Sequence, residues 1–367
     1  MTEKALKRRY GSLDGIKGLS ALGIACIYHL ATINFPYISG LPFENVVFIN
    51  WFYQNGYLLV ELFLIISGFL AVDSYMEKIF NGYEFNEFVK NRIYKIFPVM
   101  WVTLLMSLFV NIVYYNTHER MFWEYGNDSL LTLALSFMGV QDVFGISQSW
   151  NYPAWSLSQF FICWFIFYWI VKISKNSFNV GFLCFMIMCL GIIIQCNCNP
   201  NTFFSIWNAL GGYVAFFLGS ILWFINDWFA KKNKRHFLVG IMVSFGLIEL
   251  TAYKLLNVEI GILGLGYSLC IFAPLLLIII NVNALEKLLS IKPLKYFGEI
   301  SFCIYLCNYP VEVIVVTVND VLRLNINAST PVFFASYFAI NIVFSSIVHF
   351  TLGKWMAGAF KKILYEM

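Results

Sequence analysis

Charge is what this sequence has least of. Only 12% of its residues are Asp, Glu, Lys or Arg, about half of what a soluble domain carries. By contrast, 60% of the residues are apolar and 19% are aromatic. A soluble core of this size cannot bury so many apolar side chains, but a lipid bilayer can. The low charge content therefore excludes an ordinary soluble enzyme and indicates an integral membrane protein.

Several motifs of soluble enzymes are also missing. There is no G-x-S-x-G serine elbow, no H-E-x-x-H zinc motif and no P-loop. Three of the four histidines, His118, His236 and His349, fall in loops or near expected helix ends, which argues against a metal site. The nine cysteines give no disulfide framework, because most of them lie in apolar stretches where cysteine acts as a small hydrophobic residue.

Long apolar stretches are abundant and predict a bundle of about ten membrane-spanning helices. The expected spans are 14–34, 53–73, 97–115, 153–171, 178–195, 207–226, 237–255, 262–282, 300–318 and 331–352. The stretch 129–146 is short and breaks at polar residues, so we expect a re-entrant or interfacial element there. The fold class is therefore predicted to be all-α, with residues 1–367 forming a single transmembrane domain.

The positions of Lys and Arg predict how these spans are oriented. With ten crossings, all but three of the 24 Lys and Arg residues fall on one side; the exceptions are Arg120, Lys254 and Arg323. Positive residues favour the cytoplasmic side, so both termini are expected there, with the first apolar run retained as a helix. Short basic clusters between spans form no continuous basic stripe, so no nucleic-acid partner is expected.

One histidine and one glutamate lie inside the first two spans. A helical rise of 1.5 Å per residue places His29 about 18 Å from the level of Lys17, in the outer half of the bilayer, and Glu61 within about 5 Å of the same depth. Ionisable groups are costly in hydrocarbon and are functional candidates there. We expect the two side chains to pair, with His29 as a general base oriented by the carboxylate. A structural polar clasp between the helices is the alternative.

Other polar and aromatic residues are candidates for binding. Arg92 and Lys95 are three residues apart and are expected to share a helix face just before Pro98 opens a helix, although ordinary topology charge also explains them. Three aromatic residues near the outer side could stack on sugar rings or form an interfacial belt: Trp150, Tyr152 and Trp155. Hydrogen bonding inside the bundle explains the remaining polar residues of the spans: Gln195, Asn208, Glu249 and Glu312.

Three stretches together resemble membrane acyltransferase family 3. They are Leu13–Gly18 leading to His29, Val60–Phe69, and the Arg92-x-x-Lys95-Ile-Phe-Pro98 segment. Weaker matches follow in the family's order at Trp155–Leu157, Gly212–Gly219 and Gly298–Leu306. The resemblance covers nearly the whole chain, and its specific part lies in residues 1–100.

The resemblance implies an O-acyltransferase of the bacterial plasma membrane that acylates sugars outside the cytoplasm. Its donor would be an acyl-CoA, usually acetyl-CoA, bound from the cytoplasm. Its acceptor would be an exopolysaccharide or a lipid-linked sugar of the cell envelope, with polysaccharide assembly machinery as a possible partner and no metal. His29 matches the family's functional histidine, and four residues would bind the donor, the cations among them attracting its phosphates: Lys17, Ser67, Arg92 and Lys95.

Some positions depart from the family's pattern. Lys17 and Lys95 stand where arginines are common, and Glu61 stands where aspartate is usual. Asn308 occupies a position that is often histidine, and no acidic residue is evident around Gln159. The charge signs survive, but lysine cannot make the bidentate phosphate contacts of arginine.

Two other classes of protein remain open. A secondary transporter or flippase of a lipid-linked sugar is one, although no inverted repeat is visible. A non-catalytic scaffold in polysaccharide assembly is the other. Binding or hydrolysis of labelled acetyl-CoA would favour the enzyme over the transporter, and the phenotype of a His29 variant would separate the enzyme from the scaffold.

Overall fold

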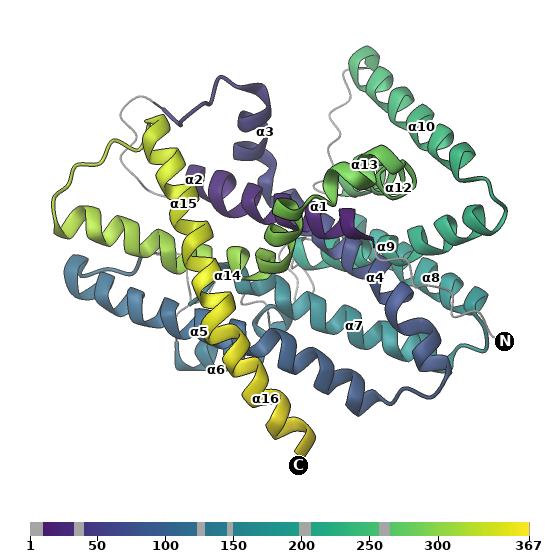
Figure 1. Ribbon diagram of the computed structural model, residues 1–367, viewed down its shortest axis with the longest axis horizontal. Helices are drawn as coiled ribbons and strands as arrows, with labels where there is room; N and C mark the ends of the chain where they lie inside the picture. The colour runs from purple at the N-terminus through teal and green to yellow at the C-terminus, as the bar shows by residue number, and fades with distance from the viewer. Residues whose placement is uncertain are drawn as a thin grey trace.

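The chain folds into a bundle of helices, shown as a computed structural model in Figure 1. The structure describes residues 10–32, 40–122, 129–144, 150–197, 207–256 and 265–366. The elements are α1 (Gly11–Leu22), η1 (Gly23–Tyr28), α2 (His29–Thr32), α3 (Val47–Asn55), η2 (Gly56–Leu58), α4 (Leu59–Phe80), α5 (Phe85–His118), α6 (Leu130–Met138), η3 (Gln141–Phe144), η4 (Tyr152–Ala154), α7 (Trp155–Ile173), α8 (Ser177–Asn197), α9 (Trp207–Lys231), α10 (Arg235–Leu256), α11 (Leu265–Tyr267), η5 (Ser268–Phe272), α12 (Ala273–Asn281), α13 (Asn283–Leu289), α14 (Lys292–Val321), α15 (Pro331–Val348), η6 (His349–Gly353) and α16 (Lys354–Glu366). Within the described ranges there is no strand, which confirms the predicted all-α membrane bundle.

Two long helices organise the bundle. α14 packs against α1, α5 and α15, and α4 packs against α9, α7 and α1. In Figure 1, α5, α7 and α14 run in roughly one direction, and the α15–α16 run passes in front of them. Four helices that carry predicted site residues, α1, α4, α5 and α7, are therefore joined either directly or through α14.

Most of the expected spans fall on helices that could cross a membrane. Seven helices among the described residues are long and apolar enough to cross a membrane, and the bent pair Ser268–Asn281 with Asn283–Leu289 would add an eighth. The other two expected spans fall on the helical run Gly11–Thr32 and on α10. α6, where a re-entrant element was expected, has nine residues and extends only about 13 Å, too little to cross.

Glycines in the recognised motifs let helix backbones approach closely. A Cβ atom on Gly68 of α4 would lie 1.8 Å from the carbonyl oxygen of Phe216 on α9, and one on Gly219 would lie 1.8 Å from that of Ile65. Ser220 donates a hydrogen bond across the same crossing to the carbonyl oxygen of Gly68. Small residues at such crossings replace the hydrophobic effect as the source of helix association in lipid.

Glycines also allow a close backbone approach between α1 and α14. A Cβ atom on Gly298 would lie 2.2 Å from the carbonyl oxygen of Asp14, and one on Gly18 would lie 2.7 Å from the backbone of Phe297 and Gly298. Both glycines lie in motifs that the sequence comparison singled out. The close crossing brings Lys17 of α1 to the side of α14.

Proline residues interrupt two of the long helices. Pro310 lies inside α14 and cannot bond the carbonyl of Leu306, so Asn151 donates to that oxygen instead, at 3.3 Å. The expectation that Pro98 opens a helix is wrong: α5 begins at Phe85 and runs through Pro98. Neighbouring helices can compensate for the missing hydrogen bond in a membrane bundle.

Candidate active site

Arg92 of α5 is held by aromatic rings. Its guanidinium carbon lies 3.4 Å from the ring centre of Trp164, 4.5 Å from that of Tyr75 and 5.6 Å from that of Phe88. These cation–π contacts fix the group without neutralising its charge. No described carboxylate pairs with Arg92, and its buried Nε has no hydrogen-bond partner in the described part of the chain. The guanidinium is therefore positioned and still able to bind an anion.

Arg92 lines a cavity of about 330 Å³ between α1, α4, α5, α7 and α14. Lys17 and Ser67 line it as well, so three of the four predicted donor-binding residues meet in one place. Ser156 and Tyr305 are also part of its wall, and the Ser156 hydroxyl donates to the Tyr305 hydroxyl at 3.1 Å. The volume lies at the lower end of the range of small-molecule sites. We call this space the Arg92 cavity.

The two lysines that were predicted to bind the donor together with Arg92 differ in their contacts. Lys17 already forms an ion pair with Asp14 at 2.8 Å, one turn earlier on α1. Lys95 does not line the cavity: its side chain is exposed and lies over the ring of Tyr94 at 5.8 Å. The two side chains are about 60° apart around α5, as expected for residues three apart, but only Arg92 lines the cavity.

Ser67 holds Trp164 in place by a hydrogen bond. The indole Nε1–H of Trp164 donates to the Ser67 hydroxyl at 3.1 Å. This bond fixes the indole whose face lies over Arg92. The next residue, Gly68, permits the α4–α9 crossing, and Phe69 packs edge-on against Tyr10 with ring centres 5.3 Å apart. The Ser-Gly-Phe motif thus orders one wall of the Arg92 cavity.

His29 lies outside the lining of the Arg92 cavity. Its side chain is buried, at 4% exposure, and follows the π-helical turn η1. The imidazole is edge-on to Tyr152 with ring centres 5.7 Å apart, and it also contacts Tyr28 at 5.5 Å. π-helical turns are often found at functional sites. His29 is therefore inside the protein and does not face lipid.

Tyr152 connects His29 to the Arg92 cavity. It interacts electrostatically with Tyr305, which lines the cavity, and with Glu312 further along α14. Its neighbour Asn151 is bonded to the proline break of α14. Tyr152 thus interacts both with Tyr305 of the cavity wall and with His29.

Glu61 does not form the expected pair with His29. Its carboxylate accepts a hydrogen bond from the Ser268 hydroxyl of η5 and lies next to Gly211 of α9. The sequence argument matched the depths of the two residues but not their directions. Val60, the preceding residue, lines the Arg92 cavity, and successive helical residues point about 100° apart. Glu61 is thereby directed to another face of α4.

The three aromatic candidates for sugar binding are held differently. Tyr152 contacts His29, as described. The Trp150 indole donates to the carbonyl oxygen of Ser129 and to the hydroxyl of Thr132, at 3.2 and 3.1 Å, next to α6. Trp155 begins α7 and is partly buried against the core. Tyr152 is therefore the member of this group that lies in the layer of His29.

Two buried acidic residues were missed or misread from the sequence. Asp142 lies in η3 and is 2% exposed; it accepts a hydrogen bond from the Gln159 amide at 3.2 Å. Burial raises the pKa of Asp142 to about 6, and the Gln159 bond acts in the opposite direction. Glu312 was expected to hydrogen-bond inside the bundle, but neither of its oxygens has a partner among the described residues. Only its position within an apolar span pointed to it.

Metal chemistry has no visible ligand set in the described ranges. No group of three or more His, Cys, Asp or Glu side chains there could hold a metal ion. Cys303 and Glu299 approach His349 at 3.7 and 3.5 Å, and Glu299 also pairs with Lys354. This small polar cluster lies beside the Arg92 cavity, since Glu299 is part of the cavity wall.

Comparison of this sequence with known proteins identifies its family. The O-acetyltransferase OatA of Staphylococcus aureus, in strains NCTC 8325, COL and MRSA252, is 25% identical over 346 residues, covering 85% of this chain and 52% of each relative. The chain thus spans about half the length of the curated relatives it matches. No solved structure matches it. The family model for the acyltransferase domain matches residues 10–350. This match confirms the resemblance found from the motifs: the chain belongs to the acyltransferase 3 family.

Proposed function

We propose that this protein moves an acetyl group from acetyl-CoA, bound from the cytoplasm, to a hydroxyl group of an extracytoplasmic polysaccharide or lipid-linked sugar. It would work as a multi-pass enzyme of a bacterial plasma membrane, with residues 10–350 as one catalytic unit. The observation that carries the proposal is the Arg92 cavity. It gathers Arg92, a positioned cation without a carboxylate partner among the described residues, with two other motif residues. Its wall residue Tyr305 interacts with Tyr152, which contacts His29.

The Arg92 cavity suits the donor. Arginine is the preferred partner of phosphate groups, because its planar guanidinium can make charge-assisted, bidentate hydrogen bonds. The free hydrogen-bonding capacity of Arg92 would be used by the phosphates of acetyl-CoA. Lys17 would add positive charge once the donor competes for it with Asp14. The apolar walls, including Phe63 and Phe160, would take the less polar arm that carries the thioester.

His29 supplies the chemistry in this proposal. Its imidazole takes the proton of the acceptor hydroxyl while the oxygen attacks the thioester carbonyl carbon. A new ester C–O bond forms, the C–S bond breaks, and the imidazolium returns the proton to the leaving CoA thiolate. Tyr152 fixes the orientation of the ring by its edge-on contact. A correctly placed general base contributes about 10²–10⁴-fold.

The proposal is tested with the purified protein in proteoliposomes. Labelled acetyl-CoA is supplied to one side, and saponified envelope polysaccharide from the producing cells is supplied to the other. Acetyl label that appears in the polysaccharide as an alkali-labile ester supports the proposal. Passage of a lipid-linked sugar across the membrane, without any binding of acetyl-CoA, would instead identify a transporter.

A further inference from the structure

Glu312 of α14 is a buried carboxyl group that the proposed mechanism does not use. Its side chain is 1% exposed, and both carboxylate oxygens lack hydrogen-bond partners within the described ranges. Placing such a group in a membrane bundle without partners is costly, and acidic residues in spans usually mark functional positions. Packing alone gives no reason for a carboxylate here.

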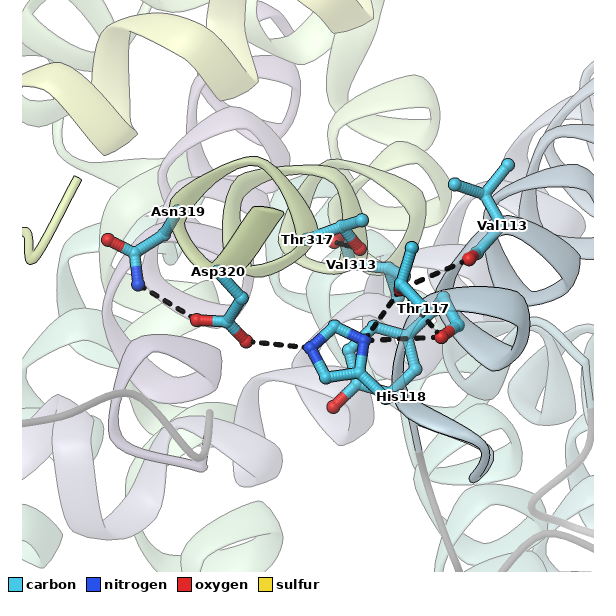
Figure 2. Close-up of polar contacts among 8 residues, drawn as sticks. Val113, Thr117, His118, Val313, Thr317, Asn319 and Asp320 are labelled. Carbon is cyan, nitrogen blue, oxygen red and sulfur yellow. Dashed lines mark hydrogen bonds and ion pairs between the residues drawn. The ribbon is translucent and has the colours of Figure 1, made fainter. Parts of the chain in front are cut away.

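Asp320, on the same helix, is a carboxylate with a structural role. Asp320 lies eight residues further along α14, and Figure 2 shows its two oxygens occupied: one contacts His118 Nε2 at 3.0 Å, and the other accepts from the Asn319 amide at 3.0 Å. That group ties the end of α14 to the end of α5. Glu312 has no such partners in the part of the chain that the structure describes, so its carboxyl group is available for a ligand.

Other polar atoms without partners lie on the same part of α14. The Asn308 amide nitrogen, one helical turn from Glu312, is buried and has no acceptor among the residues that the structure describes, while its oxygen receives a bond from Tyr337 at 3.1 Å. Asn151, which is tied to α14 through the Leu306 carbonyl, has a buried side-chain oxygen without a donor. Free acceptors and a free donor therefore occur together, which suits a ligand that can both donate and accept.

This group adjoins the layer of His29. Glu312 interacts electrostatically with Tyr152, whose ring contacts the imidazole. Hydroxyl groups can donate to a carboxylate and accept from an amide. A hydroxyl-rich molecule beside Tyr152 could therefore satisfy these atoms while presenting another hydroxyl to His29.

We propose that Glu312 binds the acceptor, with Asn308 assisting, by accepting hydrogen bonds from hydroxyl groups adjacent to the one that is acylated. The acceptor would then be a polyol in which at least two neighbouring hydroxyls are free. This inference rests on the proposed function for the identity of the reaction, but the binding site can be tested without turnover.

The test compares Glu312→Gln with wild type, using Asp320→Asn as the matched carboxylate control. Three quantities are measured: the KM for saponified envelope polysaccharide, direct binding of that polysaccharide to the purified protein, and the melting temperature in detergent. Hydrogen bonds to a charged group are strong. Glu312→Gln should therefore raise the acceptor KM and Kd about 10-fold to 100-fold, with unchanged acetyl-CoA affinity.

The melting temperature separates a binding role from a structural one. Glu312→Gln removes a carboxyl group that has no hydrogen-bond partner among the described residues, so the melting temperature should stay the same or rise. Asp320→Asn breaks existing contacts, so it should lower the melting temperature and leave acceptor affinity unchanged. Unchanged polysaccharide binding in Glu312→Gln overturns the inference. If wild type binds the polysaccharide but transfers no acetyl group, the proposed function fails, and the binding comparison still decides the role of Glu312.

Discussion

The two parts of the proposed site, a donor end at the Arg92 cavity and an acceptor end at His29, are built in different ways. At the donor end, the Arg92 cavity is open, and its charged group is held by three aromatic rings. At the acceptor end, His29 and Tyr152 are packed together, and Glu312 and Asn308 carry buried atoms without partners. At the donor end, packing positions the charged group. At the acceptor end, buried polar groups are available to bind a ligand. The comparison predicts that mutations at the two ends affect different steps.

The largest effect is expected at His29. His29→Ala should reduce the turnover number for acetyl transfer by about 10²–10⁴-fold, because the general base is lost. Acetyl-CoA affinity should be unchanged, since His29 does not line the Arg92 cavity. Initial rates of label transfer at saturating acetyl-CoA measure this. His118→Ala is the control, because His118 contacts Asp320 at the far end of α14 and should retain transfer; full activity of His29→Ala would remove this residue from the mechanism.

Substitution of Arg92 should weaken acetyl-CoA binding and leave the turnover number unchanged, the opposite of the effect expected at His29. Arg92→Ala should raise the KM for acetyl-CoA about 10-fold to 100-fold, the range expected for lost charge-assisted hydrogen bonds. Arg92→Lys should recover part of the affinity, because it keeps the charge but not the bidentate geometry. Titration of acetyl-CoA at fixed acceptor checks both variants. A fall in turnover number with no change in KM would place Arg92 in the chemistry and not in donor binding.

Substitution of Ser67 should raise the KM for acetyl-CoA less than substitution of Arg92. Ser67→Ala leaves the Trp164 indole N–H without its acceptor and loosens the ring that covers Arg92. A lost hydrogen bond of this type costs about 1–3 kcal/mol. Since part of that cost falls on stability, the KM for acetyl-CoA should rise less than in Arg92→Ala, by up to about 10-fold. Ser67→Thr keeps the hydroxyl and should behave more like wild type. An equal loss in Ser67→Thr would point to packing as the cause.

The smallest effect is expected at Lys95, although the sequence grouped it with Arg92. Its side chain is exposed and lies outside the Arg92 cavity. Exposed charges contribute less than about 1 kcal/mol, so Lys95→Ala should change the KM for acetyl-CoA by no more than about 5-fold. The same titration as for Arg92 applies. An increase as large as that of Arg92→Ala would show that donor binding extends to the surface of α5.

The sequence predicted the donor end better than the acceptor end for a physical reason. Lys17, Ser67 and Arg92 belong to local motifs, and close glycine crossings between helices bring those motifs together. Depth in the membrane also follows from sequence, because helical rise is constant. This is why the apolar spans and the short element at α6 could be anticipated.

Direction around a helix axis was harder to predict. Lys95 does not join Arg92 in the cavity wall, and Glu61 contacts Ser268 and not His29, because small rotations within the bundle decide which neighbour a side chain meets. The surroundings of Glu312 come from segments that pack on α14 but are distant in sequence, namely α5, α15 and η4. Asp142 lies in a short element next to Gln159 of α7, and no local pattern connects the two.

The most direct test of the account is the binding of a non-transferable thioether analogue of acetyl-CoA to purified wild-type, His29→Ala and Arg92→Ala proteins. The account predicts that His29→Ala binds the analogue as tightly as wild type, whereas the Kd of Arg92→Ala rises at least about 10-fold. Wild-type affinity in Arg92→Ala, or an equal loss in both variants, would contradict the separation of donor binding at Arg92 from chemistry at His29.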